Sequence, residues 1–443
     1  MLGVARMDLR LSTADHAPVV ARTTLWIVLG LVLANLLFNA AASALHLGYP
    51  YTSFLSQPDD RFGDFFKLTF SYPGAPIHPA AGSWGVDQLL AHHMADIKKY
   101  EGTVTNHFHE PPIPTLFALG ARRLISLIEP VLLFLGLLVT ALAWLFWTVL
   151  RAAPSGRPGA ALALSALLGY PALLAIDRGH FFALACATLT IAATFRTLRG
   201  KADGWAILMF AIAVNIRPNA GIVPLALFLG KQGLSFRNAV LLGVMAVSLF
   251  AATMAVDHAM YPEYTLHRFI QGIAEYAIAY GGDIGFENGS SLYGMLRGPI
   301  GYSPKLVFVP LCVGALLFVP AVLESRQNQL RSSEFLFLIL CAYVLGSHVF
   351  ADYHLLAFII PLILVAREEG PMDVSAWTIL LASSLMLAPK NFIFHPHGGA
   401  PWSWQVVVNP LVLLAAASVV LWSLWRRNAE RRRRAALDTI AAV

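Results

Sequence analysis

Charge is scarce in this sequence: 13% of the 443 residues are charged, whereas 57% are hydrophobic. A water-soluble fold of this composition would lack the polar surface needed to cover itself, so an ordinary soluble domain is excluded. The net charge of +6 does not indicate a nucleic-acid partner, because most basic residues lie in short loops between apolar segments. The composition therefore predicts an integral membrane protein.

Cysteine is also rare. Cys186, Cys312 and Cys341 all fall inside apolar segments, without CxxC or metal-ligand spacing. They are predicted to be small buried hydrophobic residues, and no disulfide framework is implied. The 14 histidines include none in an HExxH spacing, so neither a metal nor another cofactor is expected.

Long apolar runs are abundant. A run of about 20 uncharged residues crosses the roughly 30 Å hydrocarbon core, where the absence of water requires a helical backbone. The predicted fold is all-α, a polytopic transmembrane bundle of about twelve helices with a large outer loop between the first two. The helices are expected near residues 25–46, 127–150, 158–176, 180–196, 204–216, 219–230, 238–257, 305–323, 334–350, 353–366, 375–391 and 405–425.

The basic residues sort to one side of this bundle. With the N-terminus in the cytoplasm, 19 of the 31 Lys and Arg residues fall in inside segments, as the positive-inside rule requires. The predicted layout is a cytoplasmic segment 1–24 and a single transmembrane domain 25–425, which includes outer loops 47–126 and 258–304. A basic cytoplasmic tail, 426–443, is expected to contact anionic lipid.

The topology depends on a break at Arg217-Pro218. Proline removes a backbone donor and clashes with the preceding turn, so 204–230 is predicted to form two short or re-entrant helices. One unbroken helix would invert everything downstream and place the arginines between Arg426 and Arg434 outside, against the positive-inside rule.

Polar clusters that interrupt the apolar segments all fall on the outer side in this topology. Ionisable groups at membrane depth are costly and commonly functional, so an outward-facing site is predicted. In the first outer loop, Asp64 is flanked by Phe62, Phe65 and Phe66 and is the favoured candidate for a general base toward a hydroxyl. The alternative is that Asp64 is an ordinary loop acid. Asp59 and Asp60, which are adjacent to each other and followed by Arg61, are expected to lie in a solvated turn.

Arg217 is the main candidate for binding phosphate. A guanidinium grips phosphate with two parallel hydrogen bonds, and Asn215 and Asn219 are placed to satisfy backbone groups freed by the break. The competing interpretation is a snorkelling anchor that fixes topology. Arg178 and His180 carry the same ambiguity, and His354 is a candidate for hydrogen bonds to sugar or phosphate.

The order of short motifs resembles the GT-C superfamily of membrane glycosyltransferases, and within it glycosyltransferase family 87, which uses polyprenyl-phosphate-mannose. A short N-terminus and one helix precede a large outer loop with Asp64-Phe65. The further motifs are Glu110-Pro111-Pro112, Arg178-Gly179-His180, Asn215-Ile216-Arg217-Pro218 and Ser290-Ser291-Leu292-Tyr293-Gly294. The sequence departs from the family at His180, where a glutamine is usual, and at Phe66-Lys67.

The resemblance implies a GT-C-like fold and inverting transfer of a hexose, most often mannose, from a polyprenyl phosphate to an acceptor hydroxyl on the non-cytoplasmic face. Asp64 would be the catalytic base, and Arg217, Arg178 and His354 would bind the donor phosphate. Contacts with the acceptor or sugar are expected from Asp59, Asp60, His180, His107 and His109. The implied partners are the lipid-linked donor, a glycolipid or glycan acceptor and the bilayer, and the implied location is the bacterial inner membrane.

Two other functions compete with this hypothesis. A transporter or flippase for a lipid-linked or small polar substrate would also place ionisable groups in broken helices, usually at corresponding positions of two halves. The sequence shows one strong interruption, Arg217-Pro218, without an evident partner in the second half. A structural or assembly subunit would leave the one-sided polar clusters unexplained.

Overall fold

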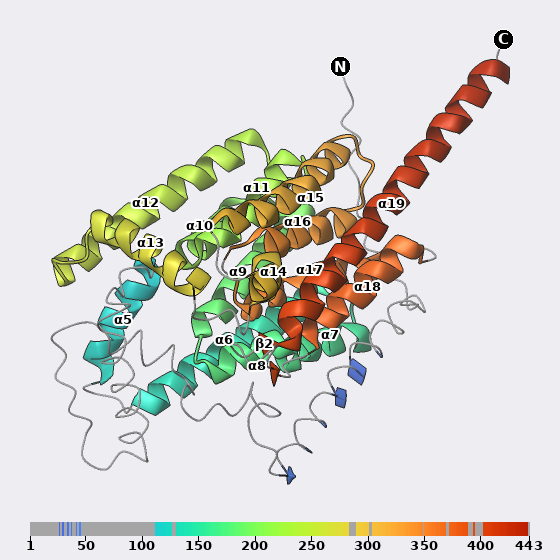
Figure 1. The fold of residues 1–443 in the computed structure, drawn as a ribbon. Helices are drawn as coiled ribbons and strands as arrows, with labels where there is room; N and C mark the ends of the chain where they lie inside the picture. Colours follow the sequence, from blue (N-terminus) through green and yellow to red (C-terminus); the bar gives the residue numbers. More distant parts are fainter. Residues whose placement is uncertain are drawn as a thin grey trace.

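The computed structural model describes residues 111–125, 130–282, 289–300, 304–348, 350–368, 372–388, 393–394 and 402–441, with nine positions between Trp26 and Leu45. These residues are almost wholly helical (Figure 1). The exception is an antiparallel pair of two-residue strands, β1 (Ile393–Phe394) and β2 (Trp402–Ser403).

Five helices in the described part of the chain are long and apolar enough to cross a membrane. They are α6 (Pro130–Ala152), α9 (Phe181–Leu198), α12 (Phe236–Met260), α15 (Phe308–Arg326) and α19 (Trp404–Ala441). A sixth span is possible if α7 (Arg157–Leu168) and α8 (Tyr170–Asp177), which are bent by 40°, are counted together. The all-helical, membrane-spanning character is therefore supported, whereas the count of twelve is not confirmed.

Eight further helices and 3₁₀ turns are shorter than a full span. They are α10 (Gly204–Ile216), the 3₁₀ turn η2 (Pro218–Gly221), α11 (Ile222–Leu229), η4 (Pro304–Val307), α16 (Ser332–Gly346), η5 (Asp352–Phe358), α17 (Ile359–Arg367) and α18 (Val374–Leu387). The predicted division of 204–230 into two short helices is confirmed. The predicted helix 158–176 instead bends at Gly169, because Pro171 favours a new helix start there.

Three helices lie where the sequence predicted outer loops. They are α5 (Pro112–Ile125), in the 47–126 loop, and α13 (Leu266–Gly282) and α14 (Leu292–Ile300), in the 258–304 loop. Polar residues such as His267, Arg268 and Glu275 interrupt their apolar positions, so a search for continuous apolar runs passes over them.

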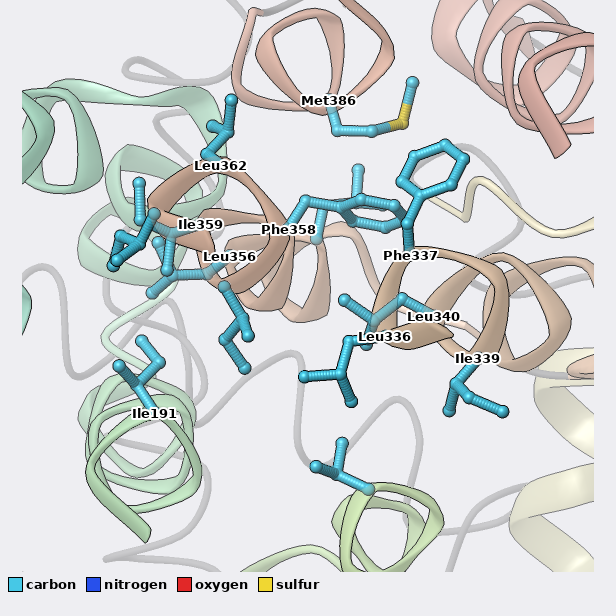
Figure 2. Close-up of a cluster of buried hydrophobic side chains, with 14 of the residues drawn as sticks. Ile191, Leu336, Phe337, Ile339, Leu340, Leu356, Phe358, Ile359, Leu362 and Met386 are labelled. Carbon is cyan, nitrogen blue, oxygen red and sulfur yellow. The ribbon is translucent and has the colours of Figure 1, made fainter. Parts of the chain in front are cut away.

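The core is centred on α16. Residues Phe335 to Leu340 of this helix are at most 2% exposed, and they pack with residues of α9, η5, α17 and α18 (Figure 2). A helix that is apolar on all sides is suited to such a central position. By contrast, Val240, Val244 and Val247 of α12 are exposed, as expected of a peripheral helix facing lipid.

Helices α15 and α16 approach each other closely at two glycines. A Cβ at Gly314 would lie 3.0 Å from both the carbonyl oxygen of Ala342 and the Cα of Gly346. Small residues permit this contact of backbones, which is typical of helix packing in membranes.

One end of the bundle gathers the loops that the sequence places in the cytoplasm. The Arg199 guanidinium donates to the carbonyl of Arg151 at 3.2 Å, and the Arg367 guanidinium donates to the carbonyl of Ala153 at 3.2 Å. The Gln232 amide donates to Ser325 Oγ at 2.9 Å, which joins two further loops there. We call this end the basic end.

Candidate functional site

The break after α10 positions Arg217 at the end of the bundle opposite the basic end. Because residues before proline disfavour the helical region, Arg217 is extended (φ −143°, ψ 106°), and Pro218 begins η2. The Arg217 N–H still donates to the Ala213 carbonyl at 2.8 Å, which completes the last turn of α10. The side chain thus leaves the helix axis at a fixed point.

A second break lies after α16. The helix ends at Gly346, the chain is extended at Ser347 and Ala351, and η5 then leads into α17. The Ser347 hydroxyl donates to the Tyr343 carbonyl at 2.6 Å, so part of the freed backbone is satisfied locally. The 3₁₀ turn that follows carries Tyr353 and His354.

These breaks bring four side chains together: Arg217, His180, Tyr353 and His354, which we call the Arg217 cluster. Arg217 Nη2 contacts His180 Nε2 and donates to the Tyr353 hydroxyl at 3.4 Å. The His180 and Tyr353 rings are 4.7 Å apart, as are the Tyr353 and His354 rings. The members come from three segments that are far apart in sequence.

The contact with Arg217 restricts the hydrogen-bonding role of His180. An arginine side chain only donates hydrogen bonds, so His180 Nε2 accepts from it only when the imidazole is neutral. Arg217 carries the positive charge of the pair, while its guanidinium also lies over the Tyr353 ring, 5.8 Å from the centroid. The cluster therefore presents an oriented guanidinium, a phenol and two imidazoles, groups that suit an anionic or polyhydroxylated ligand.

The predicted site residues fall into two groups. The structure brings Arg217, His180 and His354 together, and it places Arg178 in the turn that leads from α8 to His180. Asp64, Asp59, Asp60, His107 and His109 lie outside the described residues. The proximity of Asp64 to Arg217 therefore stays a prediction.

A second polar cluster adjoins the first and holds η5 in place. The Ser290 N–H donates to Asp352 Oδ1 at 2.9 Å, Asn409 Nδ2 donates to Ser290 Oγ at 2.7 Å, and Gln405 contacts the Tyr170 hydroxyl. All five residues are at most 1% exposed. They tie α8, η5, the start of α14 and α19 together immediately before Tyr353.

Sequence reasoning named Ser290 as part of a motif but missed Gln405 and Asn409. The pattern that could have identified them is the i, i+4 spacing of two amides at the start of an apolar helix, because this spacing places both side chains on one face. Tyr353 lies in the Asp352-Tyr353-His354 stretch that was assigned to the outer side, but it was not selected as a site residue, because a single aromatic residue near a membrane surface is common.

Helix α5 reaches the same region from the first outer loop. The Phe117 ring lies 4.9 Å from the Phe181 ring and 5.2 Å from the Phe182 ring, which directly follow His180. On another side, the Thr115 hydroxyl donates to the Tyr264 hydroxyl at 3.4 Å. The residues that follow the Glu110-Pro111-Pro112 motif therefore pack beside the Arg217 cluster.

Asp257, near the end of α12, is a buried acid that the sequence did not single out. Its side chain is fully buried, and neither carboxylate oxygen has a hydrogen-bond partner among the described residues. Within that part of the chain, no group of three or more His, Cys, Asp or Glu side chains is arranged to hold a metal ion.

A scan against protein-family models and searches of curated proteins and solved structures found no match to this chain. The resemblance to membrane glycosyltransferases therefore rests on the short motifs and their order.

Proposed function

We propose that this protein is an integral membrane glycosyltransferase that moves a hexose, mannose in the first instance, from a polyprenyl-phosphate donor to an acceptor hydroxyl. The observation that carries the proposal is the convergence of Arg217, His180, Tyr353 and His354 at the end of the bundle opposite the basic end. Two of these residues belong to motifs that resemble family 87 in their order.

The chemistry of the donor fits this cluster. Its leaving group is a phosphate, which needs charge stabilisation rather than a proton, and Arg217 provides a preorganised cation. The Tyr353 hydroxyl and the His354 imidazole are groups of the kind that form hydrogen bonds with phosphate oxygens or sugar hydroxyls. The lipid tail of the donor would lie among the apolar helices, which agrees with the presence, in the described part of the chain, of five helices long enough to span a membrane.

Asp64 is the proposed general base. It would accept the proton of the acceptor hydroxyl while that oxygen attacks the anomeric carbon from the face opposite the phosphate, so the configuration inverts. Helix α5, which follows the loop that carries Asp64 in the sequence, packs Phe117 against Phe181, so the end of that loop leads into the neighbourhood of His180. The site would face the extracytoplasmic side of a bacterial inner membrane, with a glycolipid or glycan as acceptor.

A transporter or flippase remains the second candidate, and one observation favours it. The break between α10 and α11 and the break between α16 and α17 lie in different halves of the chain, and Arg217 contacts Tyr353 across them. Interrupted helices that meet at a binding site are a feature of transporters. The sequence predicted separate helices at 334–350 and 353–366, but their junction was not identified as a counterpart of the Arg217-Pro218 break.

The test uses purified protein in lipid nanodiscs with labelled polyprenyl-phosphate-mannose and a membrane extract as the source of acceptor. We expect Asp64→Asn to abolish transfer while retaining donor binding, and Arg217→Ala to weaken donor binding. Arg157→Ala is the matched control, because Arg157 is an exposed arginine at the start of α7. Equal transfer by wild type and Asp64→Asn would remove Asp64 from the mechanism. Absence of transfer together with substrate-dependent flux in vesicles would favour the transporter.

A further inference from the structure

A pocket at the basic end, separate from the Arg217 cluster, has a volume of about 460 Å³. It is formed where α11 ends, α12 begins and α15 ends, and Figure 1 shows α11 between the other two. Its lining is Phe228, Leu229, Lys231, Gly233, Leu234, Ser235, Phe236 and Arg326. The lining therefore combines apolar side chains with two cations.

No described residue neutralises the two cations. Among the described residues, neither Lys231 nor Arg326 has an ion pair, and both are exposed. Lys231 also has a positive φ of 56°, a conformation in which glycine or asparagine is usual at a helix end. An anion is thus the natural counterpart of this pair of side chains.

The surroundings specify an anion that carries apolar chains. Helix α11 spans only Ile222–Leu229 and contacts both α12 and α15, which are longer. Leu225 of α11, Val240 and Val244 of α12 and Val319 and Leu323 of α15 are exposed large hydrophobic residues on these three helices. The Phe228 and Phe236 rings, 6.2 Å apart, lie at the junction of polar and apolar surface.

We propose that this pocket binds an anionic phospholipid, with the phosphate on Lys231 and Arg326 and the acyl chains along the exposed faces of α11, α12 and α15. Basic pockets between membrane helices on the positive side of a protein are suited to such headgroups. The volume is in the range of small-molecule sites, which is sufficient for a headgroup. This site uses none of the residues proposed for glycosyl transfer.

The test is a lipid titration of the purified protein in mixed micelles, followed by thermal unfolding, with phosphatidylglycerol compared with phosphatidylcholine. We expect wild type to be stabilised at lower concentrations of phosphatidylglycerol than of phosphatidylcholine. Each basic residue near an anionic surface contributes about five-fold to binding, so Lys231→Gln combined with Arg326→Gln should raise the midpoint of the phosphatidylglycerol titration about 25-fold. Replacing them with Arg and Lys, respectively, should retain the preference because the charges are kept.

The matched control is the pair Arg157→Gln with Arg237→Gln, which removes two exposed basic residues that do not line the pocket. The proposal is overturned if both double variants lose the preference equally, which would indicate general surface attraction, or if neither loses it. Stabilisation by inorganic phosphate alone, at the same concentration as the lipid, would also overturn it by showing that acyl chains are unnecessary.

Discussion

The charged network at the basic end offers a quantitative test of what holds the bundle together. Glu334 accepts from Arg331 at 2.8 Å and from Arg427 at 2.7 Å, and both arginines also pair with Asp373, at 2.8 and 3.0 Å. Arg331 further pairs with Glu368 at 3.1 Å. The network joins the start of α16, the end of α17, the start of α18 and the long helix α19.

The perturbation is Arg331→Met. Arg331 and Asp373 are 34% and 40% exposed, so their pair contributes at most about 1 kcal/mol. Glu334 decides the magnitude, because its side chain is fully buried and would retain Arg427 as its one cationic partner, beside the hydrogen bond from the backbone N–H of residue 331. Removing one partner of a buried ion pair costs about 3–5 kcal/mol, and because Arg427 remains we expect a loss of about 3 kcal/mol.

The assay is reversible unfolding in mixed micelles, with the free energy of unfolding compared between variants. Adding Glu334→Gln to Arg331→Met should recover part of the loss, since the buried charge is then removed together with its partner. Glu430→Gln is the control, because its pair with Arg426 is exposed on both sides. A loss below about 1 kcal/mol for Arg331→Met, or additive losses in the double variant, would refute the reasoning.

Three further predictions concern packing, buried polarity and pH. Gly314→Ala should lower the free energy of unfolding by about 1–3 kcal/mol, because the new Cβ meets backbone 3.0 Å away, whereas Gly243→Ala, which meets nothing within 4 Å, should not. Asn409→Ala should cost about 1–3 kcal/mol by leaving the buried Ser290 hydroxyl without its donor, and equal stability of Asn409→Ala and Ser418→Ala would contradict this. The hydrogen bond from Arg196 lowers the pKa of Asp203, so the stability it contributes is present above the ordinary carboxyl pKa of about 3.9 and lost as the pH falls through the folded pKa. Unfolding measured against pH should show this acid loss in wild type and not in Asp203→Asn, and identical profiles would exclude the pair as its cause.

Sequence reasoning succeeded where the deciding chemistry is local. The break at Arg217 follows from the missing donor of Pro218, and it holds in the structure. The grouping of the predicted cytoplasmic loops is likewise supported, because Arg199 and Arg367 both reach the 151–153 segment. Both inferences need only neighbouring residues or a count of charges.

The arrangement of the site could not be obtained in this way. Arg217 and Tyr353 are 136 positions apart, and only the packing of α16 and η5 in the core brings them into contact. The amides of Gln405 and Asn409 were hidden for a different reason, since two polar residues do little to lower the hydropathy of a long apolar helix. Local patterns named candidate residues, whereas tertiary packing decided which of them meet.

The length of α19 changes how its arginines act. The helix has 38 residues, so it is about 57 Å long, roughly twice the thickness of the hydrocarbon core. If its membrane segment ends near Trp425, Arg431 to Arg434 stand roughly 9–14 Å beyond the hydrocarbon, just past a headgroup layer about 5–7 Å thick. Four consecutive helical positions point to every side of the rod. These charges can therefore meet anionic headgroups on one side of the helix and partners that approach through the aqueous phase on the others.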